Sequence, residues 1–256
     1  MASTPGRCYA KLATIEATTK RLDEELAKHD PVEDANDEPI CAGGKVSVKY
    51  YALSRKNAPG CPIGMLNGAL YDRYYPDTQA VEAGYFPWYA NPSRGRAHEK
   101  FPSGLVFITQ DTEYDFDARG DLGFYYLVSE KFNNLVAQFG VSVVDASPIA
   151  ICSRAGETIA GNRYHAAVFQ DFSPETVANP RESQFVRGKF GGIARIRKLV
   201  VRDDFSSPLF KVTGMEGSSN TLICSEIFRD AAIESGVKGI EFLDASAADW
   251  PAVRPI

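Results

Sequence analysis

The feature that most constrains the fold of this chain is a segment of thirteen residues that occurs twice. Residues 129–141 read SEKFNNLVAQFGV and residues 225–237 read SEIFRDAAIESGV, with five identical positions and no gap. Each copy begins with a serine that can cap a helix and ends near a glycine that can stop one in the left-handed conformation. The first copy therefore predicts a helix over Glu130–Phe139, and the second predicts its counterpart after Ser225.

Apolar residues and flanking strands extend the match between the two copies. Phe132, Leu135, Val136 and Phe139 recur at helical spacing and predict one buried face; Phe228, Ala231 and Ala232 keep that spacing. β-branched and aromatic runs predict strands before the helices at 104–109, 123–128, 208–213 and 220–224, and a short apolar strand after each helix. The pattern predicts an α+β fold of two pseudo-repeated strand–loop–strand–helix–strand halves, approximately 45–150 and 151–256.

The remaining segments predict more strands and turns. Residues 45–53 and 164–172 have strand character, 57–64 has turn chemistry, and 173–186 is predicted as a polar loop. The stretch RIRKLVVR should place Arg195 and Arg197 on one strand face and Ile196 on the other. Cations on a solvated sheet face are favoured there over a phosphate site.

The first 44 residues are predicted to form an N-terminal extension. Apolar residues from Cys8 to Leu26 follow a 4-3-4-3-4 spacing, which predicts an amphipathic helix over 5–29 that ends before Pro31. Residues 30–44 have the composition of an acidic linker, and the α+β domain is expected to span 45–256. Docking of this helix on the protein's own body is favoured, and a homodimer through it stays an alternative.

The net charge and the apolar content of the chain limit the classes of partner that it can have. The net charge is −5, and residues 22–38 alone carry eight carboxylates and one lysine, so the remainder is close to neutral. That balance argues against a nucleic-acid-binding body. Apolar runs long enough for a membrane span or a secretory signal are missing from the sequence, and the five cysteines are scattered. We expect a cytoplasmic protein with reduced thiols.

Several segments resemble a known family in order and spacing. YHAAVFQDF (164–172), IRKLVVRDD, PLFKVTG and TLICSEIFRDAAIESGVKGIEFLD resemble the C-terminal half of the immunity-protein-eleven family. VKYYALSR (48–55) and GFYYLVSEKFNNLVAQFGV resemble its N-terminal half, so the likeness covers roughly 45–246. The family belongs to bacterial polymorphic-toxin and type VI secretion systems. The resemblance implies an antitoxin that binds and blocks a cognate toxin or effector, with no catalytic motif to transfer.

The sequence does not have the residues of a catalytic, metal-binding or cofactor-binding motif at the spacing that such a motif requires. Residues 111–121 imitate a calcium loop that starts at Asp115, but Arg119 occupies the fifth position and Tyr126 the twelfth, where ligands are required. Cys152 and His165 could be imagined as a nucleophile and its base, yet an apolar strand end around Cys152 is more often inert packing. No catalytic residue, metal site or cofactor is predicted.

The candidate partner-binding residues are acidic or aromatic. Carboxylates clustered in 111–121, or those of residues 23–38, could enter a basic cleft of a toxin, and aromatic residues in the loops at 71–92 could anchor an interface. The predicted contact residues are Asp111, Glu113, Asp115, Asp117, Asp121, Phe86, Trp88 and Tyr89. Two alternatives stay open: an enzyme that reverses or hydrolyses the toxin's product, and a ligand-binding regulatory module that uses the aromatic loops.

Overall fold

The protein has a mixed α+β fold, as the sequence predicts. The computed structural model describes residues 48–79, 81, 98, 100–120, 125–189, 191–213 and 221–247. Within these residues thirteen strands and three helices form three sheets and the layers that cover them. The predicted N-terminal helix and acidic linker, 1–44, lie outside the described residues.

The largest sheet has six strands in the order β2-β3-β6-β7-β5-β4. Only β3 and β6 run parallel; every other neighbouring pair is antiparallel. The strands are β2 (Gly68–Tyr71), β3 (Val106–Thr109), β4 (Ala118–Gly120), β5 (Tyr126–Ser129), β6 (Val143–Ser153) and β7 (Tyr164–Phe169).

A second sheet has five strands in the order β13-β1-β12-β11-β8, and a separate two-stranded ribbon pairs β10 with β9. In the second sheet only β11 and β8 are parallel. The strands are β1 (Tyr50–Arg55), β8 (Asp171–Phe172), β9 (Gln184–Arg187), β10 (Ile193–Lys198), β11 (Leu209–Val212), β12 (Leu222–Ser225) and β13 (Ile240–Asp244).

Both helices predicted from the matched segments are confirmed. Helix α2 (Glu130–Gln138) is capped by Ser129, whose side chain accepts a hydrogen bond from the Phe132 N–H. Helix α4 (Glu226–Glu234) is capped in the same way by Ser225. The stop glycines, Gly140 and Gly236, have φ of 59° and 64°, where a side chain would be strained.

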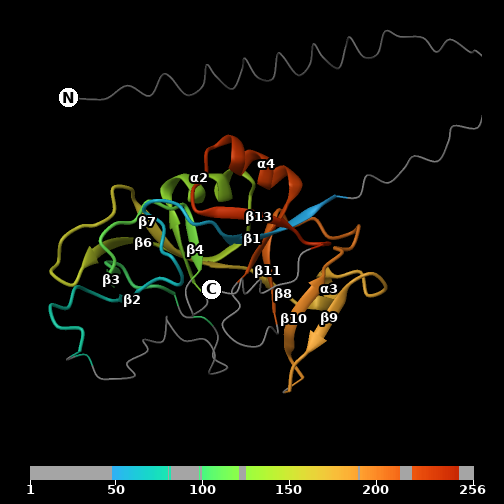
Figure 1. Ribbon diagram of the computed structural model, residues 1–256, viewed down its shortest axis with the longest axis horizontal. Coiled ribbons are helices and arrows are strands. Elements are labelled where there is room, and N and C mark those ends of the chain that lie inside the picture. The colour runs from blue at the N-terminus through green and yellow to red at the C-terminus, as the bar shows by residue number, and fades with distance from the viewer. Residues whose placement is uncertain are drawn as a thin grey trace, which may run out of the picture. The chain divides into compact units, whose positions relative to one another are not determined.

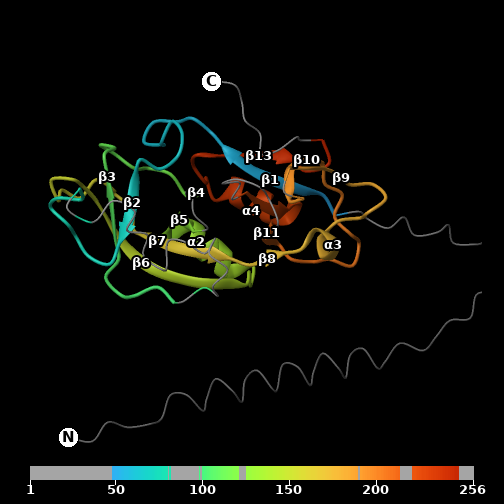
Figure 2. The same ribbon diagram turned by 90° about the horizontal axis from the view of Figure 1, so that it is seen from below.

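The core is divided among three clusters by the alternation of side chains along the strands. The central cluster packs α2 and α4 against the facing sides of both large sheets, and the two helices lie side by side in both views (Figure 1, Figure 2). In β5, Tyr126 and Val128 join this cluster, while Leu127 points into a second cluster on the opposite face. A third cluster lies behind the five-stranded sheet, where β10 and the short helix α3 (Pro174–Val177) cover it.

Strand order around the two helices is alike. The strand before α2 is β5 and the strand after it is β6, and β7 lies between them, antiparallel to both. The strand before α4 is β12 and the strand after it is β13, and β1 lies between them, again antiparallel to both. Each helix therefore connects two strands of one sheet across a strand from elsewhere in the chain.

The structure also corrects the predicted elements. β6 continues to Ser153, well past the short strand predicted after Gly140 and across the approximate division at 150/151. β4 lies inside the acidic segment 111–121, for which no strand is predicted, and the segment expected to be a polar loop at 173–186 contains α3 and the start of β9. Across the described ranges, none of the helices has the length and apolar character needed to cross a bilayer.

Candidate functional site

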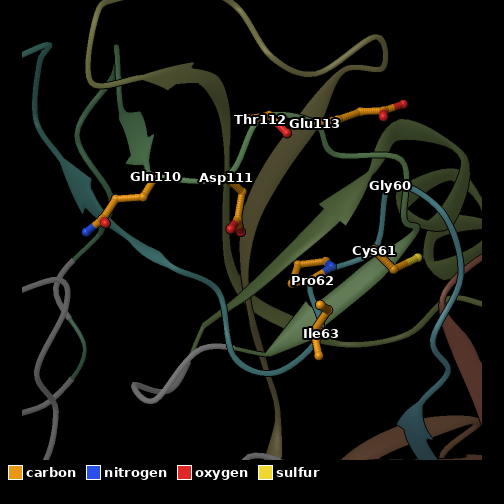
Figure 3. A pocket seen from close by; sticks show the side chains of 8 residues that line it. All are labelled: Gly60, Cys61, Pro62, Ile63, Gln110, Asp111, Thr112 and Glu113. Carbon is orange, nitrogen blue, oxygen red and sulfur yellow. The ribbon is translucent and has the colours of Figure 1, made fainter.

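The candidate site is a pocket between the turn that follows β1 and the segment that follows β3 (Figure 3). It has a volume of about 350 Å³, at the lower end of the range for small-molecule sites. Its lining residues are Gly60, Cys61, Pro62, Ile63, Gln110, Asp111, Thr112 and Glu113. The two acidic residues belong to the predicted contact residues.

The Asp111 carboxylate is held in place by a buried tyrosine. Tyr114 is 1% exposed, and its hydroxyl donates to Asp111 Oδ2 at 2.8 Å and lies 3.0 Å from Thr109 Oγ1. Burial raises the pKa of Tyr114 above its usual value, so the phenol keeps its proton and can donate it. Thr109 also accepts a hydrogen bond from the Asp111 N–H at 3.1 Å, which fixes the backbone at this edge of the pocket.

Opposite Asp111, the turn presents an apolar side chain to solvent. Ile63 is 92% exposed, the largest exposed fraction among the large hydrophobic residues of the described chain, and nearby Met65 is 38% exposed. Glu113 is also exposed, and Figure 3 shows it on the side of the pocket away from Ile63. A protruding isoleucine with carboxylates beside it has the arrangement of an apolar interface core with a polar rim.

The turn that follows β1 is held close to the acidic segment that follows β3. The Asp115 N–H donates to the Gly60 carbonyl at 2.7 Å, and Gly60 has φ of 73°. A Cβ on Gly60 would lie 2.7 Å from the Asp115 Cβ, so only glycine permits this approach. Cys61 Sγ lies 3.7 Å from the Asp115 carbonyl, and burial raises the pKa of this thiol.

The Asp115 carboxylate is largely occupied by hydrogen bonds within the protein. Its carboxylate accepts a hydrogen bond from Lys238 Nζ at 2.6 Å and one from Asn162 Nδ2 at 3.3 Å. The Asp115 and Lys238 side chains are 36% and 55% exposed, so their ion pair lies at the surface. A partner would have to displace Lys238 to use this carboxylate.

Asp117 is buried and contributes to the scaffold. It is 3% exposed, and its carboxylate accepts hydrogen bonds from the Ser129 hydroxyl, the Lys238 N–H at 2.6 Å and Lys131 Nζ at 3.2 Å. These contacts join the N-terminus of α2 to the segment before β13. We therefore leave Asp117 out of the contact surface, although it was among the predicted contact residues.

Four predicted contact residues lie outside the described part of the chain. They are Asp121, Phe86, Trp88 and Tyr89. Of the predicted set, the structure thus brings Asp111 and Glu113 together at one pocket, ties Asp115 to Lys238, and encloses Asp117.

A buried arginine lies next to this region in β4. Arg119 is 2% exposed, and none of its three guanidinium nitrogens has a hydrogen-bond partner among the described residues. Burial and the positive charge of Arg55 lower the pKa of Arg119 below its usual value. Buried charges without partners are rare because their desolvation is uncompensated, so Arg119 is an unusual feature of this core.

Cys152 and His165, which the sequence analysis considered as a nucleophile and its base, are far apart. His165 pairs with Pro148 across β7 and β6, and Cys152 follows four residues later along β6. At 3.3 Å per residue the two side chains are separated by about 13 Å. Burial also raises the pKa of the Cys152 thiol, which disfavours the thiolate.

A histidine–carboxylate contact that sequence reasoning did not predict lies elsewhere. His98 Nε2 is 2.8 Å from Asp145 Oδ2, and the same oxygen accepts a hydrogen bond from the Phe101 N–H at 2.6 Å. The two side chains are 47 residues apart in sequence, so no local pattern could have paired them. Among the described residues no group of three or more His, Cys, Asp or Glu side chains could hold a metal ion.

Comparison with models of known protein families gives no match for this chain, and no curated protein matches it. The candidate site is therefore defined by its own geometry. Ile63 is the functional candidate that sequence reasoning missed. The available signal was an isoleucine placed inside a Pro- and Gly-rich turn, APGCPIG, where no periodic pattern assigns it to a core.

Proposed function

We propose that this protein is a cytoplasmic antitoxin that binds a cognate toxin or secreted effector and blocks it by occlusion. The sequence resemblance to the immunity-protein-eleven family of polymorphic-toxin and type VI secretion systems supports this function. The observation that carries it is the exposed Ile63 at the edge of a pocket whose opposite side bears Asp111 and Glu113. No enzymatic activity is part of the proposal.

The pocket suits a side chain or a short loop of another protein. An apolar anchor fully desolvated at the centre of an interface supplies much of the binding energy, and surrounding charges guide the encounter. Ile63 provides the anchor, while Asp111 and Glu113 favour a partner with basic residues. A toxin that acts on nucleic acid would offer such a basic surface at its active cleft.

We also propose that the scaffold consists of two duplicated halves that exchange one strand. The strand orders β4-β5-β7-β6 and β11-β12-β1-β13 match, and all neighbours within them are antiparallel. In this arrangement β1 of the first half lies in the second sheet, and β7 of the second half lies in the first. Residues 45–156 and 157–256 should then fold only when expressed together; independent folding of either piece would contradict the exchange.

Chemical labelling of Cys61 tests the proposed interface directly. Cys61 lines the pocket, so its thiol should become protected from a maleimide reagent when the partner binds. The partner is identified by affinity capture from the native host with this protein as bait. The product of the neighbouring gene is then tested for binding to this protein. The control is a Cys61→Ser variant, which identifies the labelled thiol. Unchanged labelling of Cys61 in a complex that forms normally would place the interface elsewhere.

A further inference from the structure

The two-stranded ribbon β9–β10 is firmly seated on the body of the protein. Ile193 and Ile196 of β10 are buried in the third cluster, and Phe185 of β9 packs against it. The cluster also contains Val177 of α3 and Phe210 of β11. One face of the ribbon is thus fixed by apolar packing, and the other face is available to solvent.

Irregular pairing explains how β10 buries these residues. In a regular strand Ile193 and Ile196 would point to opposite faces, because side chains alternate. The pairing of β10 with β9 shifts register between Ile193 and Arg195 and again between Ile196 and Lys198. The first of these irregularities lies between the two isoleucines and allows both to face the cluster, while Arg195 and Arg197 are exposed.

The outward side of the ribbon is strongly basic. The two strands and the turn between them carry four exposed cations and one half-buried cation: Arg187, Lys189, Arg195, Arg197 and Lys198. No Asp or Glu occurs between Glu182 and Asp203. Since the whole chain has a net charge of −5, removing these five positive charges leaves −10 for the rest. The ribbon is therefore a positively charged region of a protein whose other residues carry a net negative charge.

We propose that this cationic ribbon docks an acidic surface of a partner protein. β10 has six residues, so the ribbon offers a basic strip about 20 Å long. A nucleic acid duplex carries charge along its whole length and would continue from this strip across a chain that is otherwise negative. An acidic patch on a protein can be as short as the ribbon. A protein therefore matches the charge of this surface better than a nucleic acid duplex does.

This surface is separate from the pocket at Ile63. In both views the ribbon and α3 lie at the end of the described body opposite β2 and β3 (Figure 1, Figure 2). The two surfaces also belong to different clusters, on different sheets. Docking at the ribbon therefore does not depend on the proposed antitoxin function, and the two can fail independently.

Binding of labelled poly-L-glutamate to the full chain, measured by fluorescence anisotropy, tests the proposal. The test variant is K189Q/R197Q, which removes two exposed cations of the ribbon. The control variant is R154Q/R163Q, which removes two exposed arginines outside it. We expect the ribbon variant to weaken binding about tenfold and to reduce its salt dependence, while the control variant binds as the wild type does.

Three results would overturn the proposal. The first is a wild-type chain that does not bind poly-L-glutamate at low salt. The second is an equal loss in both variants, which would show that only total charge matters. The third is tighter, ribbon-dependent binding of a labelled DNA duplex than of poly-L-glutamate, which would make the ribbon a nucleic-acid surface. Thermal unfolding of both variants checks that neither is misfolded.

Discussion

Phe132 of α2 and Phe228 of α4 meet edge to face, with ring centroids 5.9 Å apart. Each phenylalanine stands three residues after the capping serine of its helix, and both are fully buried. The two matched segments of the sequence therefore meet each other in the structure at equivalent positions. The contact lies in the central cluster, where side chains of both large sheets also converge.

Double-mutant cycles should detect this contact. Phe132→Leu and Phe228→Leu each remove one ring and keep most of the volume, so each should lower the free energy of unfolding by about 1 kcal/mol. Because the rings interact directly, the double variant should show a coupling energy of about 0.5–1.5 kcal/mol by chemical denaturation. Phe132→Leu combined with Phe210→Leu, which lies in another cluster, is the additive control. A coupling near zero for the first pair would mean that the rings contribute only through their separate burial.

Asp117 should be important for stability. Asp117→Asn keeps the shape but removes the charge that the Ser129 hydroxyl, Lys131 and the Lys238 N–H all approach. Hydrogen bonds to charged groups are worth about 1.5–3 kcal/mol each, so a loss of about 2–4 kcal/mol is expected on denaturation. The matched control is Asp115→Asn, whose ion pair is exposed and should cost less than about 1 kcal/mol. Equal effects of the two substitutions would show that burial of Asp117 has no special consequence.

Replacing the buried Arg119 should stabilise the protein. Its guanidinium has no hydrogen-bond partner within the described part of the chain, so Arg119→Met removes an uncompensated desolvation cost and retains an unbranched apolar stem. We expect a gain of about 1–4 kcal/mol in the free energy of unfolding. The exposed Arg154, changed to Met, is a neutral control. A loss of stability on Arg119→Met would instead mean that the guanidinium has an acceptor in solution.

His165 should make stability depend on pH. Burial lowers the pKa of His165, and the negative charge of Glu130 opposes this shift only in part. The unfolded chain therefore takes up a proton near the usual histidine pKa of about 6.5, while the folded protein takes it up only at lower pH. Stability that is present above this pH should fall as the solution is acidified toward the folded-state pKa. Urea denaturation at a series of pH values should show a flatter profile for His165→Gln; identical profiles would exclude the histidine as a contributor.

Local signals in the sequence were sufficient for α2, α4 and most strands, but not for α3, which lies in a segment predicted as a polar loop. The capping serines, the stop glycines and the 3.6-residue period are short-range features, and they predicted α2 and α4 to within a residue or two. The length of β6 was not predictable in this way, because its central residues alternate weakly and include Pro148. Pairing with both β3 and β7 extends that strand, and such pairing is not encoded locally.

The candidate site was predictable only in part. Charge clustering identified the acidic segment, but it could not distinguish Asp111 and Glu113, which line a pocket, from Asp117, which is buried. That difference arises because Lys238 and Ser129, distant in sequence, fold against Asp117. The exposure of Ile63 is likewise set by the turn around it, which Gly60 holds against Asp115.

The antitoxin proposal is tested most directly by growth of a host that expresses the product of the neighbouring gene. Co-expression of the wild-type chain should restore growth, and Ile63→Glu combined with Glu113→Lys should abolish both the rescue and the measured complex while leaving the thermal unfolding of the chain unchanged. Rescue without any detectable complex, or growth that is unaffected by the neighbouring gene, would contradict a protein that works by binding and blocking a toxin.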